Sequence, residues 1–363
     1  MENKIKNIVI TIGFVMIIFV IFIMNIVTED KTVSQSERRT LQSFPKITVD
    51  TLKSGNAMDG FEKYTTDQFV ARDTFRYIKS FFNINLYKQK DNNKLFEKDG
   101  GIYKMDYPLN ETNLNKSLDK ISSVYNKYLK DKNMNVYFSI IPDKNYYLEN
   151  DDHLKIDYNK VKEIASNKLQ NLKYIDIWKD LTLEDYYRTD LHWKQENLSK
   201  VINTIERNLE LTSTQNTVYN INNLGDFYGT YYGQLATSVT PDKLYILTND
   251  TITNSSVYNY ETQKYGPVYT NETSADRYDT YLYGATPLIR IDNPQSNSDR
   301  ELLVFRDSFS SSLAPLLIEN YASITLIDLR YISSNLLDKY IEFNDQDVLF
   351  IYSTLILNQN VLK

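Results

Sequence analysis

Residues Leu302–Phe309 read LLVFRDSF, an apolar run that ends in Arg306, Asp307 and Ser308. A short apolar run bounded by charged residues is typical of a buried strand. The small-residue segment Ser310–Ala314 follows and is suited to opening a helix. A strand, a serine and a helix in this order place Ser308 at the carboxyl end of a strand, where open α/β sheets gather their reacting groups.

The same alternation of strands and helices runs through much of the chain. Strands are predicted at 136–141, 174–178, 302–305, 324–329 and 348–352, and amphipathic helices at 114–128, 161–172 and 198–209. This pattern predicts an α/β fold in three layers, with a mainly parallel sheet covered by helices on both faces. Residues 211–298 are rich in Thr, Asn, Tyr and Gly, break the rhythm, and predict an insertion of strands and loops near the site.

The N-terminal residues Ile8–Val27 are long and apolar enough to cross a bilayer as a helix. Lys4 and Lys6 precede this run and acidic residues follow it, which predicts a cytoplasmic N-terminus and an outward-facing remainder. A cleavable signal peptide is the alternative. The run is longer than the ~7–15 apolar residues usual for such a signal, and no Ala-x-Ala-like site follows it, so an uncleaved anchor is preferred.

The expected organisation is an anchor at 1–28, a polar stalk at 29–60, and an α/β domain at 61–363 with its insertion at about 211–298. Apolar residues between Phe61 and Leu86 recur at helical spacing and predict a packed helix. The formal net charge of −6 argues against nucleic acid as a partner. The 363 residues include no cysteine, so disulfides and thiolate metal sites are excluded, and no metal or cofactor is expected.

A second polar segment, Thr189–Trp193, supplies Asp190 and His192, one of only two histidines in the chain. A serine hydroxyl is a weak nucleophile and needs a base within hydrogen-bond reach and a third group that orients the base. Histidine suits the role of base because its ordinary pKa lies near neutrality. The sequence therefore suggests Ser308 as nucleophile, His192 as base and Asp190 as the orienting acid.

Each of these residues also has a structural alternative. Ser308 is suited to capping the helix that follows it. His192 is equally suited to bonding the backbone of its own loop, with Trp193 filling the core. It is the joint pattern of motifs along the chain that favours the site.

That joint pattern resembles the DHHW proteins, relatives of the alginate O-acetylation proteins in the SGNH hydrolase-like superfamily. The resemblance is spread over most of the region after the anchor, and the segments that carry it are Glu37-Arg38-Arg39 with Leu41 and Pro45, Asp67-Gln68-Phe69 with Arg72, Ile141-Pro142-Asp143-Lys144, Asp190-Leu191-His192-Trp193 and Arg306-Asp307-Ser308-Phe309. It implies an SGNH-like fold and the catalytic roles given above. The acid and histidine precede the serine, the order of the acetylation branch, whereas Leu191 replaces the second residue of the namesake motif.

Relatives often carry a Gly-Gly-Asn-like turn that helps to bind the oxyanion, and the corresponding segment here is Gly284-Ala285-Thr286-Pro287. Thr286 is expected to donate through its hydroxyl, or the Ser308 amide to carry more of the task. Arg306 and Lys144 are further candidates for contacts with substrate or acyl oxygen. For both, a salt bridge or a solvated loop end is the alternative.

The resemblance implies a membrane-anchored, extracytoplasmic O-acetyltransferase or acetylesterase that acts on a cell-surface or secreted polysaccharide. It also implies a polytopic membrane acyltransferase as the partner that delivers acetyl groups. A non-catalytic carbohydrate-binding or assembly protein with the same fold is the competing class. The thirty tyrosines suit either class, because aromatic rings stack on sugars and also fill cores.

Overall fold

The computed structural model describes residues 2–34, 36–132, 134–149, 152–271 and 274–363. The chain forms two compact units, one of residues 1–92 with 233–238 and one of residues 93–232 with 239–363. The compact units thus divide after residue 92, whereas the sequence predicts that the α/β domain begins at residue 61. The predicted limits of the anchor, the stalk and the insertion remain predictions.

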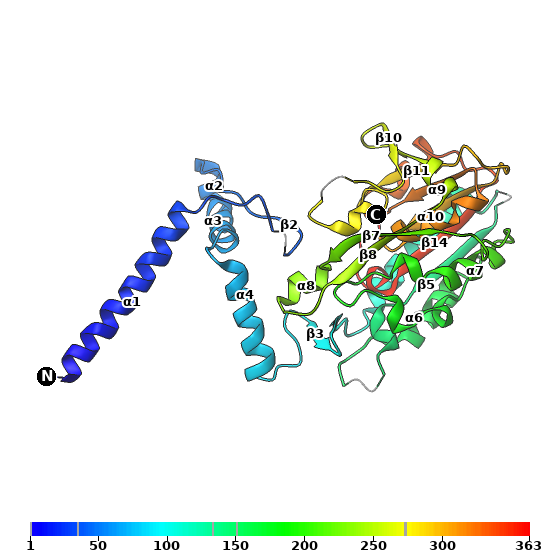
Figure 1. Ribbon diagram of the computed structural model, residues 1–363. Coiled ribbons are helices and arrows are strands. Elements are labelled where there is room, and N and C mark those ends of the chain that lie inside the picture. Colours follow the sequence, from blue (N-terminus) through cyan, green and yellow to red (C-terminus); the bar gives the residue numbers. More distant parts are fainter. Residues whose placement is uncertain (1, 35, 133, 150–151, 272–273) are drawn as a thin grey trace. The chain divides into compact units, whose positions relative to one another are not determined.

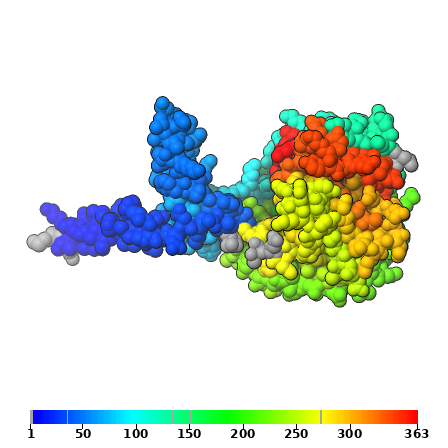
Figure 2. Space-filling view, turned by 90° about the horizontal axis from the view of Figure 1, so that it is seen from above, coloured from blue at the N-terminus to red at the C-terminus, as the bar shows by residue number. Residues whose placement is uncertain are grey.

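The first unit is mainly helical. Its elements are α1 (Glu2–Val27), β1 (Val33–Ser34), β2 (Arg39–Thr40), α2 (Val49–Lys53), α3 (Asn56–Asp67), α4 (Arg72–Phe81) and the π-helical turn η1 (Phe82–Leu86). Helix α1 is a long straight helix in the ribbon and space-filling views (Figures 1 and 2), and its apolar stretch Asn3–Val27 is not buried. At 1.5 Å per residue its 25 residues extend about 37 Å, enough to span a membrane core of about 30 Å. A signal sequence has the same character.

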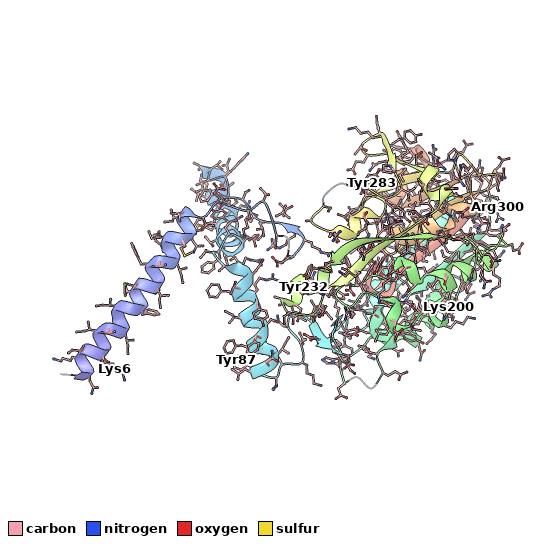
Figure 3. All side chains as sticks on the ribbon, viewed as in Figure 1. Lys6, Tyr87, Lys200, Tyr232, Tyr283 and Arg300 are labelled. Carbon is pink, nitrogen blue, oxygen red and sulfur yellow. The ribbon has the colours of Figure 1, made fainter. Side chains whose placement is uncertain are left out.

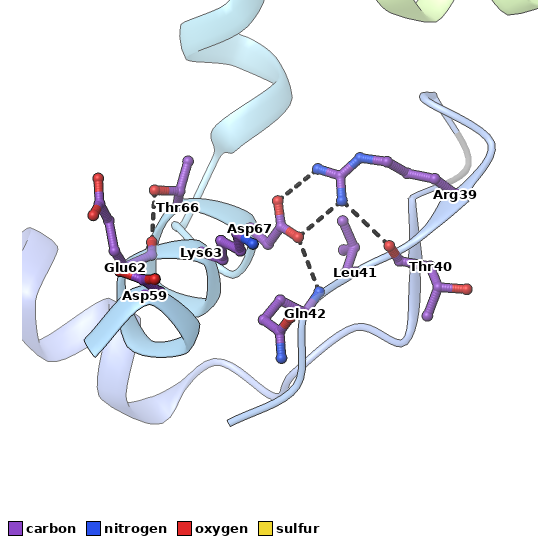
Figure 4. Close-up of a pocket in the computed structure, with 9 residues that line it drawn as sticks. All are labelled: Arg39, Thr40, Leu41, Gln42, Asp59, Glu62, Lys63, Thr66 and Asp67. Carbon is purple, nitrogen blue, oxygen red and sulfur yellow. Dashed lines mark hydrogen bonds and ion pairs between the residues drawn. The ribbon is translucent and has the colours of Figure 1, made fainter. Parts of the chain in front are cut away.

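Several residues that carry the resemblance form an ion-pair network in this first unit. Arg39 makes a two-pronged contact with Asp67, at 2.8 and 2.5 Å, and the backbone N–H of Gln42 donates to the same carboxylate (Figure 4). The hydrogen bonds from Arg39 lower the pKa of Asp67 to about 2. Glu37 pairs with Arg72 on α4. The network borders an open depression of about 650 Å³.

The helix predicted between Phe61 and Leu86 forms as α3, α4 and η1, but the expectation that it is packed is wrong. Its apolar residues lie on the surface of the chain: Phe61, Phe69, Phe75, Ile78, Phe81 and Phe82 are each between 38 and 50% exposed. Helical spacing showed that these residues share a face, and spacing alone does not determine what covers that face.

The second unit is built on an eight-stranded sheet of order β10-β9-β11-β13-β12-β14-β5-β6. The strands are β5 (Val136–Ile141), β6 (Lys173–Tyr174), β9 (Ser256–Asn259), β10 (Lys264–Pro267), β11 (Leu288–Asp292), β12 (Glu301–Arg306), β13 (Ser323–Ile327) and β14 (Asp347–Ser353). The five strands from β13 to β6 are parallel, and β11, β9 and β10 extend the sheet antiparallel. The predicted α/β class is confirmed.

Helices cover both faces of this sheet (Figure 1). They are α5 (Glu111–Val124), α6 (Tyr158–Lys168), α7 (Ser199–Asn208), α9 (Asp250–Asn254), α10 (Ser310–Leu317) and α11 (Thr354–Leu357). The crossovers β5-α6-β6 and β12-α10-β13 run in opposite directions along the sheet, so right-handed connections place α6 and α10 on opposite faces. Helix α5 packs against α6 and α11, and α7 packs against α10.

The predicted insertion contributes more to the fold than loops. It contains the hairpin β7 (Asn220–Phe227) and β8 (Asp242–Thr248), the short helix α8 (Thr230–Leu235), and the three antiparallel strands of the main sheet. Strand β11 pairs directly with β13 over five residues. A second hairpin, β3 (Leu95–Lys98) and β4 (Gly101–Lys104), turns at Asp99-Gly100.

Candidate active site

Ser308 lies two residues beyond the central strand β12 and two residues before α10. Strand β12 is buried from Leu302 to Arg306 and pairs in parallel with β13 and β14. Ser308 itself is partly exposed, although its neighbours Asp307 and Phe309 are buried. The carboxyl end of β12 therefore leaves Ser308 partly accessible to solvent between buried neighbours.

Asp190, His192 and Ser308 lie in direct contact. Nδ1 of His192 is 2.5 Å from Oδ1 of Asp190, and Nε2 of His192 is 2.8 Å from Oγ of Ser308. A carboxylate only accepts hydrogen bonds, so the Nδ1 hydrogen is assigned to the bond with Asp190. That assignment leaves Nε2 as the acceptor for the Ser308 hydroxyl.

The loop that carries Asp190 is held from two sides by buried polar groups. Nζ of Lys144 donates to the backbone carbonyls of Tyr187, Arg188 and Asp190 at 2.9, 3.1 and 2.7 Å. Asp242, at the start of β8, accepts from the backbone N–H of Thr189 at 2.8 Å and from its hydroxyl at 2.6 Å. Burial lowers the pKa of Lys144 to about 7. The three hydrogen bonds direct the Lys144 side chain at the carbonyls of the loop, and in this way they support the loop.

A close backbone approach fixes the Asp190 carboxylate itself. The N–H of Thr230 donates to Oδ2 of Asp190 at 2.6 Å, and the N–H of Gly229 donates to the Thr189 hydroxyl at 2.9 Å. A Cβ atom on Gly229 would lie 2.4 Å from Cβ of Asp190 and 2.1 Å from the Thr189 carbonyl oxygen. Only glycine permits this approach, so Gly229 belongs to the support of the acid.

Aromatic groups lock the His192 ring and tie its loop to α10. The ring of Tyr278 stacks on the imidazole at 3.9 Å with an angle of 8° between the planes, and Phe309 packs against it at 4.9 Å. Nε1 of Trp193 donates to the carbonyl of Phe309 and to Oγ of Ser312, both at 3.0 Å. The histidine and the serine are therefore held by one set of contacts, although they lie 116 residues apart.

Buried hydrogen bonds also join the ends of the neighbouring strands. Oδ2 of Asp307 accepts from the N–H of Ser353 at the end of β14, at 2.7 Å. The hydroxyl of Thr354 donates to Asp143, which follows β5, at 3.0 Å. These bonds fix the carboxyl edge of the three strands β12, β14 and β5 on which the site rests.

Thr286 and Arg306 lie together beside the serine segment. Nη2 of Arg306 donates to the Thr286 hydroxyl at 3.3 Å, and Nη1 donates to Oγ of Ser311 at 2.7 Å. Arg306 is fully buried, and burial lowers its pKa. A hydroxyl that accepts from Arg306 keeps its own hydrogen for another acceptor. The N–H of Ser308 has no acceptor among the described residues.

The arrangement places a hydroxyl, an imidazole and a carboxylate in the order of contacts that acyl transfer by a serine nucleophile would need. No group of three or more His, Asp or Glu side chains suited to a metal occurs in the described ranges. Sequence reasoning missed Tyr278, Gly229 and Asp242, which all lie in the predicted insertion. A tyrosine among thirty carries no signal of its own, and neither does one glycine in a loop.

The DHHW family profile, described as DHHW protein, matches residues 174–327. No curated protein sequence matches the chain. A DHHW family protein from Eubacterium siraeum has a similar structure, with a TM-score of 0.60, 19% identity, and coverage of 74% of this chain and 95% of that one.

PatB1 from Bacillus cereus, solved with a sulfonyl adduct, has a TM-score of 0.58 and 19% identity, over 74% of this chain and 98% of its own. The O-acetyltransferase domain of Pseudomonas putida AlgJ matches at a TM-score of 0.45 and 13% identity, over 73% of this chain and 92% of its own. The first two similarities establish a shared fold, and the predicted resemblance to the DHHW proteins is confirmed.

Proposed function

We propose that this protein is an SGNH-like serine O-acetyltransferase or acetylesterase that acts on a polysaccharide. The observation that carries the proposal is the continuous contact from Asp190 through His192 to Ser308, at 2.5 and 2.8 Å. The sulfonyl adduct of PatB1 is consistent with a reactive group on the shared fold. The choice of an acetyl group and a polysaccharide follows the resemblance to the DHHW proteins and their relatives in alginate O-acetylation.

In the first half-reaction, Oγ of Ser308 bonds to the acyl carbon while its proton passes to Nε2 of His192. The bond to the leaving oxygen then breaks, and His192 returns the proton to that oxygen. In the second half-reaction, a sugar hydroxyl or water gives its proton to His192 and attacks the acyl-serine, and Ser308 is released as the alcohol. Asp190 holds the ring in the required tautomer and stabilises the imidazolium.

The negative charge on the acyl oxygen needs preorganised donors. We propose the N–H of Ser308 and the hydroxyl of Thr286 for this role, with Arg306 orienting the Thr286 hydroxyl. A donor of this kind contributes roughly 2.7–4 kcal/mol to transition-state stabilisation. Lys144 is assigned to positioning Asp190, because its ammonium already donates to three carbonyls.

We further propose that α1 is an uncleaved single-pass anchor with its N-terminus in the cytoplasm and the α/β unit outside. Lys4 and Lys6 precede the apolar stretch, and Glu29 and Asp30 follow it. The proposed partner is a polytopic membrane acyltransferase that delivers acetyl groups, as the resemblance to the DHHW proteins implies.

The test is hydrolysis of a chromogenic acetyl ester by the full chain in detergent. Ser308→Ala and His192→Ala should each reduce turnover to the background rate. Two matched controls should retain it: Ser310→Ala, whose Oγ has no hydrogen-bond partner in the described chain, and His153→Ala, which removes the other imidazole. Equal turnover in all five proteins would refute the proposed site and favour the non-catalytic class.

Two further measurements refine the outcome. A sulfonyl fluoride should modify the parent at Ser308, with loss of fluoride, and should leave Ser308→Ala unmodified by mass spectrometry. Addition of a soluble oligosaccharide distinguishes the two activities, because a transferase produces acetylated sugar and an esterase produces only acetate.

A further inference from the structure

The continuous helix formed by α4 and η1 turns its polar side toward its own unit. Arg72 pairs with Glu37, Arg76 donates to the carbonyl of Gly233 at 2.6 Å, and Ser80 is buried. The opposite side carries the exposed residues Phe75, Ile78, Phe81, Phe82 and Leu86, here called the apolar face. A helix of a water-soluble domain normally buries its apolar stripe and exposes its polar one. In α4 only Ser80 is buried, and the apolar stripe is exposed.

The exposure of the apolar face is large for every member. The exposed fractions are 49% for Phe75, 41% for Ile78, 50% for Phe81, 42% for Phe82 and 60% for Leu86. Single exposed apolar residues are ordinary, whereas a contiguous apolar patch marks a binding surface. This face is therefore a candidate binding surface of the first unit.

Hydrogen bonds place the beginning of this helix at the end of α1. Oδ1 of Asn25, in the last turns of α1, accepts from the N–H of Val70 at 3.0 Å. The side chain of Gln68 bonds both the N–H and the carbonyl of Lys31, at 2.9 and 3.0 Å. Because the apolar stretch of α1 ends at Val27, these contacts hold the segment before α4 at the depth where a membrane core gives way to headgroups.

We propose that the apolar face lies in the headgroup region of the bilayer that α1 spans, as a second membrane contact. The inference rests on the proposed anchoring by α1. An interfacial helix of this kind buries its apolar side by about 5–10 Å. Lys79 and Lys88 are exposed on the same helical segment and just after it, where they can reach anionic headgroups.

The absence of cysteine from the sequence makes a direct test practical. Single substitutions Ile78→Cys and Phe82→Cys report on the apolar face, Ile17→Cys on the middle of α1, and Lys200→Cys on an exposed site of α7 in the other unit. Figure 3 shows Lys200 on that helix and Tyr87 just beyond the end of η1. Each full-length variant is labelled with an environment-sensitive fluorophore in vesicles of phosphatidylcholine and phosphatidylglycerol.

The expected result is blue-shifted emission at positions 78 and 82, quenched by nitroxides attached near the lipid headgroup and shielded from aqueous iodide. Position 17 should respond most to deep nitroxides, and position 200 only to iodide. If position 17 responds and positions 78 and 82 are reached by iodide alone, the inference is refuted while the anchor stands. Shielding without lipid quenching would instead show that protein covers the face, and would also refute the inference. If position 17 shows no lipid contact, the anchor itself fails, and the inference fails with it.

Discussion

A single methyl group added at Gly229 should disable the site without touching any reacting atom. The new Cβ would lie 2.4 Å from Cβ of Asp190 and 2.1 Å from the carbonyl oxygen of Thr189. Ordinary contacts of this kind begin at 3.4 Å, so the two segments must separate by about 1 Å. That movement weakens the Thr230 bond to Asp190 and shifts the support of His192.

The expected magnitude follows from the displacement. A misplacement of about 1 Å can cost about 10²-fold in rate, which corresponds to about 2.7 kcal/mol in the activation barrier. Overpacking of this kind also lowers the free energy of unfolding by about 1–3 kcal/mol. The measurement is kcat/KM for acetyl ester hydrolysis by Gly229→Ala, with the midpoint of thermal unfolding recorded on the same preparation.

Gly13→Ala is the matched control, because a Cβ there meets no atom within 4 Å. If Gly229→Ala fails to fold, Thr230→Pro offers a second route. Proline is tolerated in the first turn of a helix, and it removes the N–H that donates to Asp190. Parent-like kcat/KM in a folded Gly229→Ala variant would refute the reasoning that this close approach positions the acid.

Three other substitutions test the remaining supports. Asp190→Asn should lower kcat by up to about 10⁴-fold with little change in structure, because an amide no longer selects the Nδ1–H tautomer; an unchanged kcat would remove Asp190 from the mechanism. Thr286→Val should lower kcat/KM by about 10²–10³-fold if the Thr286 hydroxyl binds the oxyanion. Thr286→Ser is the control, because it keeps the hydroxyl. Parent-like activity in Thr286→Val would leave the Ser308 amide as the proposed donor. Lys144→Met should remove a pH dependence of stability. Burial lowers the pKa of Lys144 to about 7 in the folded protein, so between pH 7 and the ordinary lysine pKa the unfolded chain binds one more proton than the folded chain. In the parent, this group therefore makes the free energy of unfolding rise with pH by up to about 1.4 kcal/mol per pH unit. Identical slopes in parent and variant, from denaturant titrations at several pH values, would contradict that assignment.

The parallel part of the sheet was predictable because a strand that is buried on both faces has a continuous run of apolar residues in the sequence. Strands β5, β12 and β14 are apolar at nearly every position, and each coincides with a predicted run. The strand predicted at 174–178 is shorter than expected, since β6 comprises only Lys173 and Tyr174 before the chain turns into a short 3₁₀ helix at Trp178. An edge strand has one partner, and so local sequence specifies its length less strongly.

The antiparallel edge of the sheet was not predictable in the same way. Strands β9 and β10 are partly exposed and rich in Tyr, Asn and Gly, which is also the composition of loops. What makes them part of the sheet is pairing with β11, which in turn pairs with β13. Pairing between distant segments is a property of the folded chain, and no window of sequence contains it.

The residues that support the candidate site could not be predicted from the sequence for a related reason. Asp190 and His192 lie on a loop, and the groups that hold this loop are Lys144 after β5, Asp242 at β8 and Tyr278 from the predicted insertion. The type of the lysine suggested a contact with substrate. Only its position among three carbonyls indicates a role in positioning.

The support of the Asp190 loop gives a reason for the burial of Lys144 at a place where an apolar residue would pack more favourably. Replacing a buried ion by an apolar side chain of similar size is often neutral or stabilising, whereas leaving its partners unpaired is costly. A methionine at position 144 would leave three carbonyls free to turn away, and Asp190 would lose its fixed orientation. We therefore interpret the buried amino group of Lys144 as a constraint on geometry, which the proposed catalysis by Ser308 would require and which packing of apolar groups alone does not provide.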